Sequence, residues 1–346
     1  MDRIIIEAIL KPLFSTIQPA SFVDVGHSLY VEPLSNQQCL IVDTPQSVAN
    51  YLEAVSWNDL EQKLAKTLTG LPYIEVINKG TGKVVASSLT LNHRLGSGYL
   101  ALHVESPLKE ILIREIDVDG LYETLFKYDP NSIIHGCFIN RIGGDRVHRV
   151  PRLLTGRIEA KNVVAVQTGG ASKDPLSASG KEWDMSFFEK EKSNDGDKTS
   201  AYGLGNLPYH QQEYACELIA AKFIINCHLI EATGLPTEAQ NLLAAMAEWK
   251  VLKFLQSSIR LRTTEYECGE ITGGTKELDL LEKEIPKLIK ACTKKGYFAK
   301  PVITQVSLTL QPPPSKPKSK PKSKNKSTND SQKQEEDSCS QLKLNY

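Results

Sequence analysis

Hydrophobic and polar positions alternate along this chain with the periods of both strands and helices. Residues 19–34 have the pattern of a strand. A helix is expected from Pro45, because Thr44 or Asp43 can cap it and proline fits a first turn. Residues 60–68 are expected to continue helically.

Two hairpins are predicted in the first half of the chain. In the first, apolar β-branched runs at 73–77 and 84–91 flank a glycine-rich turn. In the second, a strand over Ser132–Asn140 is followed by a turn at Gly143–Asp145 and a strand that starts at Val147 and continues past Arg152. Residues 108–128, between the hairpins, are expected to be mostly helical, with a break at Gly120.

The second half begins with a change of composition. Residues 169–206 are rich in Gly, Ser, Lys and Asp and are predicted to form a long loop, a length that usually marks a functional or mobile segment. The apolar run 214–230 fits a buried strand or a helix equally well. The other expected elements are a helix from Leu235-Pro236-Thr237 to Leu255, a strand at 260–267, a helix at 276–295 and a strand at 302–310.

Hairpins mixed with helices predict an α+β fold around an antiparallel sheet. We expect one domain over residues 1–310 and a disordered tail over 311–346, where Pro, Ser and Lys alternate without apolar partners. The tail has eight Lys against four acidic residues, a net charge of +4, so the rest of this neutral chain has −4. The tail either solubilises the protein or attracts nucleic acid, and the sequence leaves both readings open.

Composition excludes several classes of protein. The 346 residues contain no run of 18 apolar residues, so no membrane span is expected, and the first residues do not resemble a signal peptide. The seven cysteines are scattered without a CxxC pair, which argues against a disulfide framework or zinc finger and favours a reducing cytoplasm. Motifs for nucleotide cofactors, metals and serine nucleophiles are absent, so no cofactor or metal is expected, and the sequence singles out no catalytic residue.

Basic residues concentrate around the second hairpin. Because guanidinium groups bind phosphates bidentately and stack on bases, such a ridge favours a polyanion track over a solvated strand face. Arg260 and Arg262 either extend this surface or are outer-face charges. The members of the ridge are Arg141, Arg146, His148, Arg149, Arg152 and Arg157, with Lys161 just beyond.

Several segments together resemble one family, the backbone subunits of type I-U (also called I-G) CRISPR effector (Cascade) complexes of the RAMP superfamily. The resemblance spans residues 20–270 in the family's order. Its segments are DTPQSVANYLEA (43–54), HRLGSGY (93–99), DPNSIIHGCFIN (129–140), RVHRVPRLLTGRIEAKNV (146–163), LGNLPYHQQEY (204–214) and SIRLRTTEYE (258–267).

This resemblance implies an RRM-like, ferredoxin-type βαββαβ core with large insertions, in which 169–206 is a thumb-like loop. It implies a non-catalytic, antiviral subunit that polymerises head to tail along CRISPR RNA, presents the guide to target DNA and contacts other effector subunits. The RNA-binding residues that it implies are His93, Arg94, Arg146, Arg149, Arg152, Lys161 and Lys173.

Two other functions remain open. One is a metal-independent endoribonuclease of the same superfamily, with His27, His93 or His135 as general base. The other is a protein–protein scaffold with a basic disordered tail.

Overall fold

The computed structural model describes residues 2–22, 24–101, 106, 108, 118–140, 147–172 and 207–308. The chain divides into two units, Met1–Thr309 and Leu310–Tyr346. The predicted disordered tail and most of the predicted loop at 169–206 lie outside the described residues. Within the described part, no helix is long and apolar enough to span a membrane.

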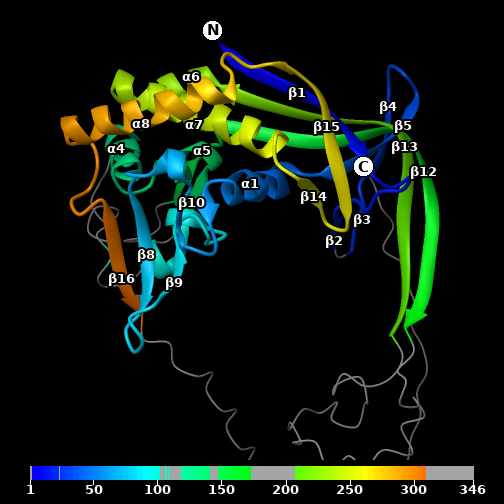
Figure 1. Cartoon of the computed structure of the whole chain (residues 1–346), viewed down its shortest axis with the longest axis horizontal. Coiled ribbons are helices and arrows are strands. Elements are labelled where there is room, and N and C mark those ends of the chain that lie inside the picture. The colour runs from blue at the N-terminus through cyan, green and yellow to red at the C-terminus, as the bar shows by residue number, and fades with distance from the viewer. Residues whose placement is uncertain are drawn as a thin grey trace, which may run out of the picture. The chain divides into compact units, whose positions relative to one another are not determined.

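One seven-stranded antiparallel sheet forms the centre of the first unit (Figure 1). Its strands, in the order β14-β15-β1-β13-β12-β5-β4, are Ile259–Leu261, Thr264–Gly273, Arg3–Pro12, Leu207–Asn226, Leu154–Ser172, Gln37–Asp43 and Leu29–Glu32. The inner order β15-β1-β13-β12 is that of a ferredoxin-type βαββαβ core, with β12 and β13 as its central hairpin. The α+β fold with an antiparallel sheet is therefore confirmed.

Buried and outward-facing residues alternate strictly along β1, which lies inside this sheet between β15 and β13. Ile4, Ile6, Ala8 and Leu10 are buried on one face, and the residues between them face outward or are half-buried. β1 pairs on one side with β13 and on the other with β15. Both edges of β1 are thus hydrogen-bonded within the sheet.

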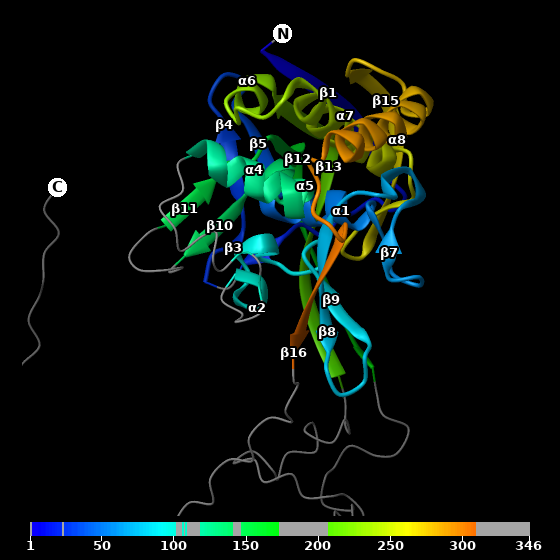
Figure 2. The same cartoon turned by 90° about the vertical axis from the view of Figure 1, so that its left-hand side faces the viewer.

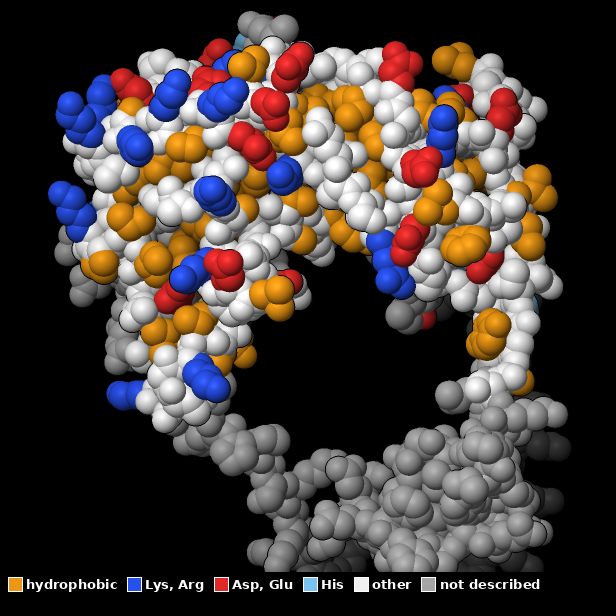
Figure 3. Space-filling model, in the orientation of Figure 1, with side chains coloured by type: hydrophobic (Ala, Val, Ile, Leu, Met, Phe, Trp, Pro, Cys, Tyr) orange, Lys and Arg blue, Asp and Glu red, His pale blue; other side chains and the backbone are white. Residues whose placement is uncertain are grey.

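Helices cover the buried face of the sheet. α1 (Pro45–Ala54) packs on β12, and α7 (Thr237–Leu255) packs on β13 and α1. Thr44 caps α1 as predicted, because its side chain accepts a hydrogen bond from the Ser47 amide. α7 is apolar on nearly all sides because it lies between the sheet and α8 (Leu278–Lys295). Over much of this helical layer, Figure 3 shows Lys and Arg side chains beside Asp and Glu.

Smaller elements lie beside the main sheet (Figure 2). A three-stranded sheet joins the predicted first hairpin, β8 and β9, to the last strand, β16, which pairs with β8 in parallel. Its strands are Tyr73–Asn78, Val84–Ser87 and Ile303–Leu308. Three separate two-stranded ribbons are β2 with β3 (Ser21–Phe22, Gly26–His27), β6 with β7 (Trp57–Asn58, Lys63–Leu64), and β10 with β11 (Cys137–Asn140, Val147–Val150). Within the described residues, further helices are η1 (Lys66–Leu68), η2 (Arg94–Gly96), α2 (Gly98–Ala101), α4 (Val118–Tyr128), α5 (Pro130–His135) and α6 (Cys227–Glu231).

Several local predictions were wrong, among them the single strands expected at 19–34 and 260–267, each of which is divided into shorter strands. Residues 60–68 form β7 and η1 instead of a continued helix, and α4 runs through Gly120 without a break. The segment before Gly136 is the short helix α5, because Asp129 caps it and Pro130 occupies its first turn. Residues 169–172 are not loop but the end of β12, paired with β13. This pairing extends β12 and β13 beyond the sheet as a two-stranded arm (Figure 1).

Candidate nucleic-acid interface

The second hairpin forms one wall of a cationic cavity of about 690 Å³, which we call the hairpin pocket. β10 and β11 pair in register, so Phe138 lies opposite Arg149 and Cys137 opposite Val150. The first half of α1 and the segment from Asn92 to Arg94 supply the facing wall. The lining residues are Gln46, Asn50, Asn92, His93, Arg94, His135, Gly136, Cys137, Phe138, Arg149, Val150 and Arg152.

Two guanidinium groups of this pocket are available to an anion. Arg149 is exposed, and its guanidinium lies 5.5 Å from the centre of the Phe138 ring, which is itself 45% exposed. Arg152 is half-buried and hydrogen-bonded to Gln46. Burial lowers the pKa of Arg152, and the nearby Arg94 adds to the effect, so an incoming anion relieves repulsion between two cations.

Arg94 has a structural position instead. Its side chain is buried, and its Nε and Nη2 each donate to the Glu53 carboxylate at 2.7 Å. Its Nη1 donates to the Gly136 carbonyl at 3.1 Å. The Arg94 backbone has a φ of 52°, an uncommon value for a residue with a side chain, and the buried ion pair holds it there. The guanidinium therefore tethers η2 to α1 and faces no solvent.

A buried polar network continues from Glu53 beneath the pocket. Lys250, from the middle of α7, donates to Ser56 Oγ at 2.7 Å and to Asn131 Oδ1 at 2.6 Å. The Asn131 amide in turn donates to Glu53 Oε1 at 2.9 Å. Burial raises the pKa of Asp129, which caps α5, to about 6. The network joins α1, α5, α7 and η2, the elements around the pocket.

Lys250 gives this network a pH dependence. Burial lowers the pKa of Lys250 from 10.5 to about 8, so above about pH 8 the folded state binds fewer protons here than the unfolded state. We therefore expect the contribution of Lys250 to the free energy of unfolding to rise with pH from about 8 toward 10. Urea unfolding at about pH 7.5 and about pH 9.5 checks this: the difference between wild type and Lys250→Met should grow in favour of wild type. A constant or shrinking difference contradicts the expectation.

His135 is the buried group of the pocket that has no partner. Its side chain is 1% exposed, and neither ring nitrogen has a hydrogen-bond partner. Burial lowers its pKa well below 6.5, and the nearby Lys250, Arg94 and Arg152 reinforce this. The ring is therefore neutral, and both of its nitrogens are sealed from water.

The other predicted residues lie on different elements. Arg157 pairs with Glu159 at 2.9 Å, and Lys161 lies 3.5 Å from Glu32, so acids neutralise both β12 cations. Arg262 donates to the buried Asp43 at 2.8 Å, and only Arg260 of that pair is exposed without an acidic partner among the described residues. Arg141, Arg146 and Lys173 lie outside the described residues.

The glycine-serine-glycine stretch after Arg94 serves packing. A Cβ atom at Gly96 would lie 2.2 Å from the Phe138 carbonyl oxygen, so only glycine lets η2 lie this close to β10. Gly96 therefore marks a contact between two walls of the pocket. Sequence reasoning also missed Phe138, Gln46, Asn50 and Asn92, whose types carry no signal before the fold brings them together.

One comparison with known proteins covers the part of the chain that forms the hairpin pocket. A family model described as CRISPR-associated protein GSU0053 matches residues 4–165, a range that includes all the residues lining the hairpin pocket. No curated protein matches the chain. A solved structure described as "CRISPR RNA-guided surveillance complex, pre-nicking" is similar at 12% identity and a TM-score of 0.34, over 73% of this chain and 68% of that chain. The family match supports a CRISPR-associated role.

Proposed function

We propose that this chain is a non-catalytic RNA-binding backbone subunit that polymerises along a CRISPR RNA guide in a DNA-targeting antiviral effector complex. The observation that carries the proposal is the hairpin pocket, where Arg149, Arg152 and His93 line one concavity. The family match over 4–165 supplies the CRISPR context. Target DNA, neighbouring copies of the chain and other effector subunits are its proposed partners, and the cytoplasm is its proposed location.

The chemistry of the pocket suits a single RNA strand. Guanidinium groups bind phosphate oxygens in a bidentate manner, and an exposed aromatic ring beside an arginine stacks on bases of any sequence. Phe138 and Arg149 form such a pair at the rim. The arm of β12 and β13 leads to residues 173–206, which lie outside the described residues and which we propose to separate nucleotides of the guide.

Co-purification tests this function. The full chain is expressed with a repeat–spacer RNA, isolated at moderate salt and weighed by light scattering. We expect a particle with several copies of the chain on RNA of discrete length, and this RNA stays intact during incubation with the purified protein. A monomer free of RNA contradicts the proposal and favours the protein–protein scaffold.

The endoribonuclease remains the second candidate because His93 is exposed within a cationic pocket. The other two histidines are less accessible as bases. His135 is sealed, and the Nδ1 atom of His27 lies 3.2 Å from the Tyr214 hydroxyl. Cleavage of repeat RNA in the presence of a chelator, abolished by His93→Ala, would establish this enzyme and displace the non-catalytic function.

A further inference from the structure

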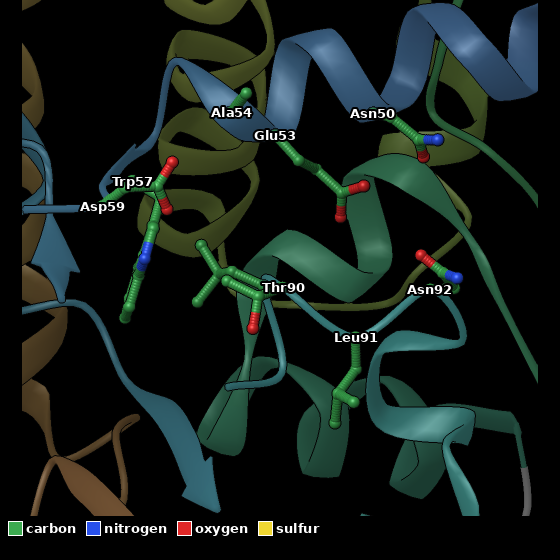
Figure 4. Close-up of a pocket in the computed structure, with 9 residues that line it drawn as sticks. Asn50, Glu53, Ala54, Trp57, Asp59, Thr90, Leu91 and Asn92 are labelled. Carbon is green, nitrogen blue, oxygen red and sulfur yellow. The ribbon is translucent and has the colours of Figure 1, made fainter. Parts of the chain in front are cut away.

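A second, smaller cavity opens next to the hairpin pocket, and we call it the side pocket. Its volume is about 220 Å³, less than the roughly 300 Å³ or more of a site for a drug-sized ligand, so it suits a single ring system. Asn50 and Asn92 line both cavities and therefore mark where they meet. Figure 4 shows these two amides at one end of the side pocket and Trp57 and Asp59 at the other.

The far end of the side pocket presents polar groups without partners. Trp57 is 9% exposed, and its indole Nε1 has no hydrogen-bond acceptor. A buried donor of this kind costs about 1–3 kcal/mol unless something satisfies it. The side chain of Asp59 is in no hydrogen bond or ion pair within the described part of the chain. Because Trp57 Nε1 has almost no accessible surface, the exposed carboxylate of Asp59 is the free polar group at this end of the cavity.

Glu53 lies between the two ends of the side pocket in Figure 4, but its carboxylate already has hydrogen-bond partners within the protein. Its carboxylate accepts two hydrogen bonds from Arg94 and one from Asn131. The free negative charge of the side pocket therefore belongs to Asp59, whereas Arg149 and Arg152 give the adjoining hairpin pocket its positive charge. The two adjoining cavities have opposite character, one suited to an anion and one to a group with N–H donors.

We propose that the side pocket binds a guanine base of an RNA nucleotide whose phosphate is held in the hairpin pocket. This inference rests on the proposed RNA-binding function and extends it from backbone contact to base recognition. A carboxylate accepts hydrogen bonds from both the N1–H and the exocyclic amino group of guanine, while the O6 and N7 acceptors face donors. Asp59 is the carboxylate, and the exposed amides of Asn50 and Asn92 are the donors.

Guanine fits the side pocket better than the other bases because it has two adjacent N–H donors that one carboxylate can accept. Adenine has no ring N–H, and cytosine and uracil each lack the pair of adjacent donors that a carboxylate can accept together. Inosine differs from guanosine only by the missing exocyclic amino group. It therefore isolates one of the two hydrogen bonds assigned to Asp59.

The experiment uses the full chain and two uridine-rich RNA oligonucleotides of equal length, one with a single guanosine and one with inosine at that position. Fluorescence anisotropy at fixed salt gives the two dissociation constants. We expect guanosine to bind roughly tenfold tighter than inosine, the size of one hydrogen bond to a charged group. In Asp59→Asn, whose amide presents a donor toward the base, we expect the ratio to fall close to one.

Two matched variants guard against an effect of folding or of charge alone. The Trp57 ring makes an edge contact with Tyr73, with 5.6 Å between the ring centres, and Trp57→Phe keeps an aromatic ring there. This variant should weaken the binding of both oligonucleotides, while the preference for guanosine persists. Glu61→Gln removes an exposed acid on the same turn, outside the pocket, and should leave the ratio unchanged.

The outcomes separate this inference from the proposed function. Tight binding of both oligonucleotides with equal affinity overturns the guanine site and leaves RNA binding intact. Binding of guanosine monophosphate but of neither oligonucleotide supports the guanine site with a free nucleotide as its ligand and contradicts the RNA-binding subunit. Failure of all three probes to bind overturns both.

Discussion

Replacing Arg149 and Arg152 together with glutamate should weaken RNA binding by at least about tenfold at fixed salt. Both side chains line the hairpin pocket, and neither forms an ion pair within the described residues. The loss of two phosphate contacts should also reduce the slope of log affinity against log salt by about 1.4, since each contact to a single strand contributes about 0.7. Anisotropy titrations over a salt series measure both quantities.

A charge-matched variant separates the pocket from general electrostatics. Lys287 and Lys290 are exposed on α8, so changing both to glutamate alters the net charge by the same amount elsewhere on the surface. We expect this control to change affinity by less than about threefold. Equal losses of RNA affinity in the two double variants would mean that binding depends on the net charge of the protein and that the hairpin pocket has no special role.

The substitution Glu53→Ala should lower the free energy of unfolding by about 3–5 kcal/mol, because it leaves the buried Arg94 guanidinium without its carboxylate. Lys250 is also buried nearby, so two cations lose their compensating charge. Urea unfolding measures the effect as a lower midpoint with an unchanged slope. If Glu53→Ala does not fold, Glu53→Gln, which keeps the shape and removes the charge, provides the measurement.

An exposed ion pair is the matched control for this network. Lys276 Nζ lies 2.5 Å from Glu284 Oε2 on the surface, and 40% and 34% of the two side chains are accessible. Glu284→Ala should cost less than about 1 kcal/mol, since water already screens the pair. A loss at Glu53 as small as the loss at Glu284 would contradict the structural position assigned to Arg94.

Local signals were sufficient for much of the fold. The cap at Thr44, the hairpin of β8 and β9 and the amphipathic α8 were all predictable because their causes lie within a few residues. The class of fold followed from the mixture of these elements. The extent of β12 and β13 was not predictable in this way, because polar and glycine-rich residues such as Gly169 and Gly170 become strand only through pairing with Tyr209 and His210.

The candidate site was predictable only in part, for a physical reason. A cluster of arginines in the sequence indicates positive charge, but it does not show whether an acidic residue of another element forms an ion pair with each arginine. Glu53 comes 41 residues before Arg94 and pairs with it in the interior, whereas Arg149 has no acidic partner among the described residues and lies beside the Phe138 ring. The sequence pattern gave no indication of the side pocket, because its lining residues, such as Trp57 and Asn92, come together around one cavity only after folding.

The pairing of β1 has a consequence for synthesis of the chain. Arg3–Leu10 hydrogen-bonds to Ile219–Asn226 on one side, and residues 6–12 pair with residues 266–273 on the other. At roughly 5–20 residues per second, translation delivers the first partner about 10–45 seconds after β1 is made. The nascent chain must carry an isoleucine-rich segment with two open edges throughout that interval. Until its partners are made, this segment is therefore a site where unpaired strand edges can associate with other chains.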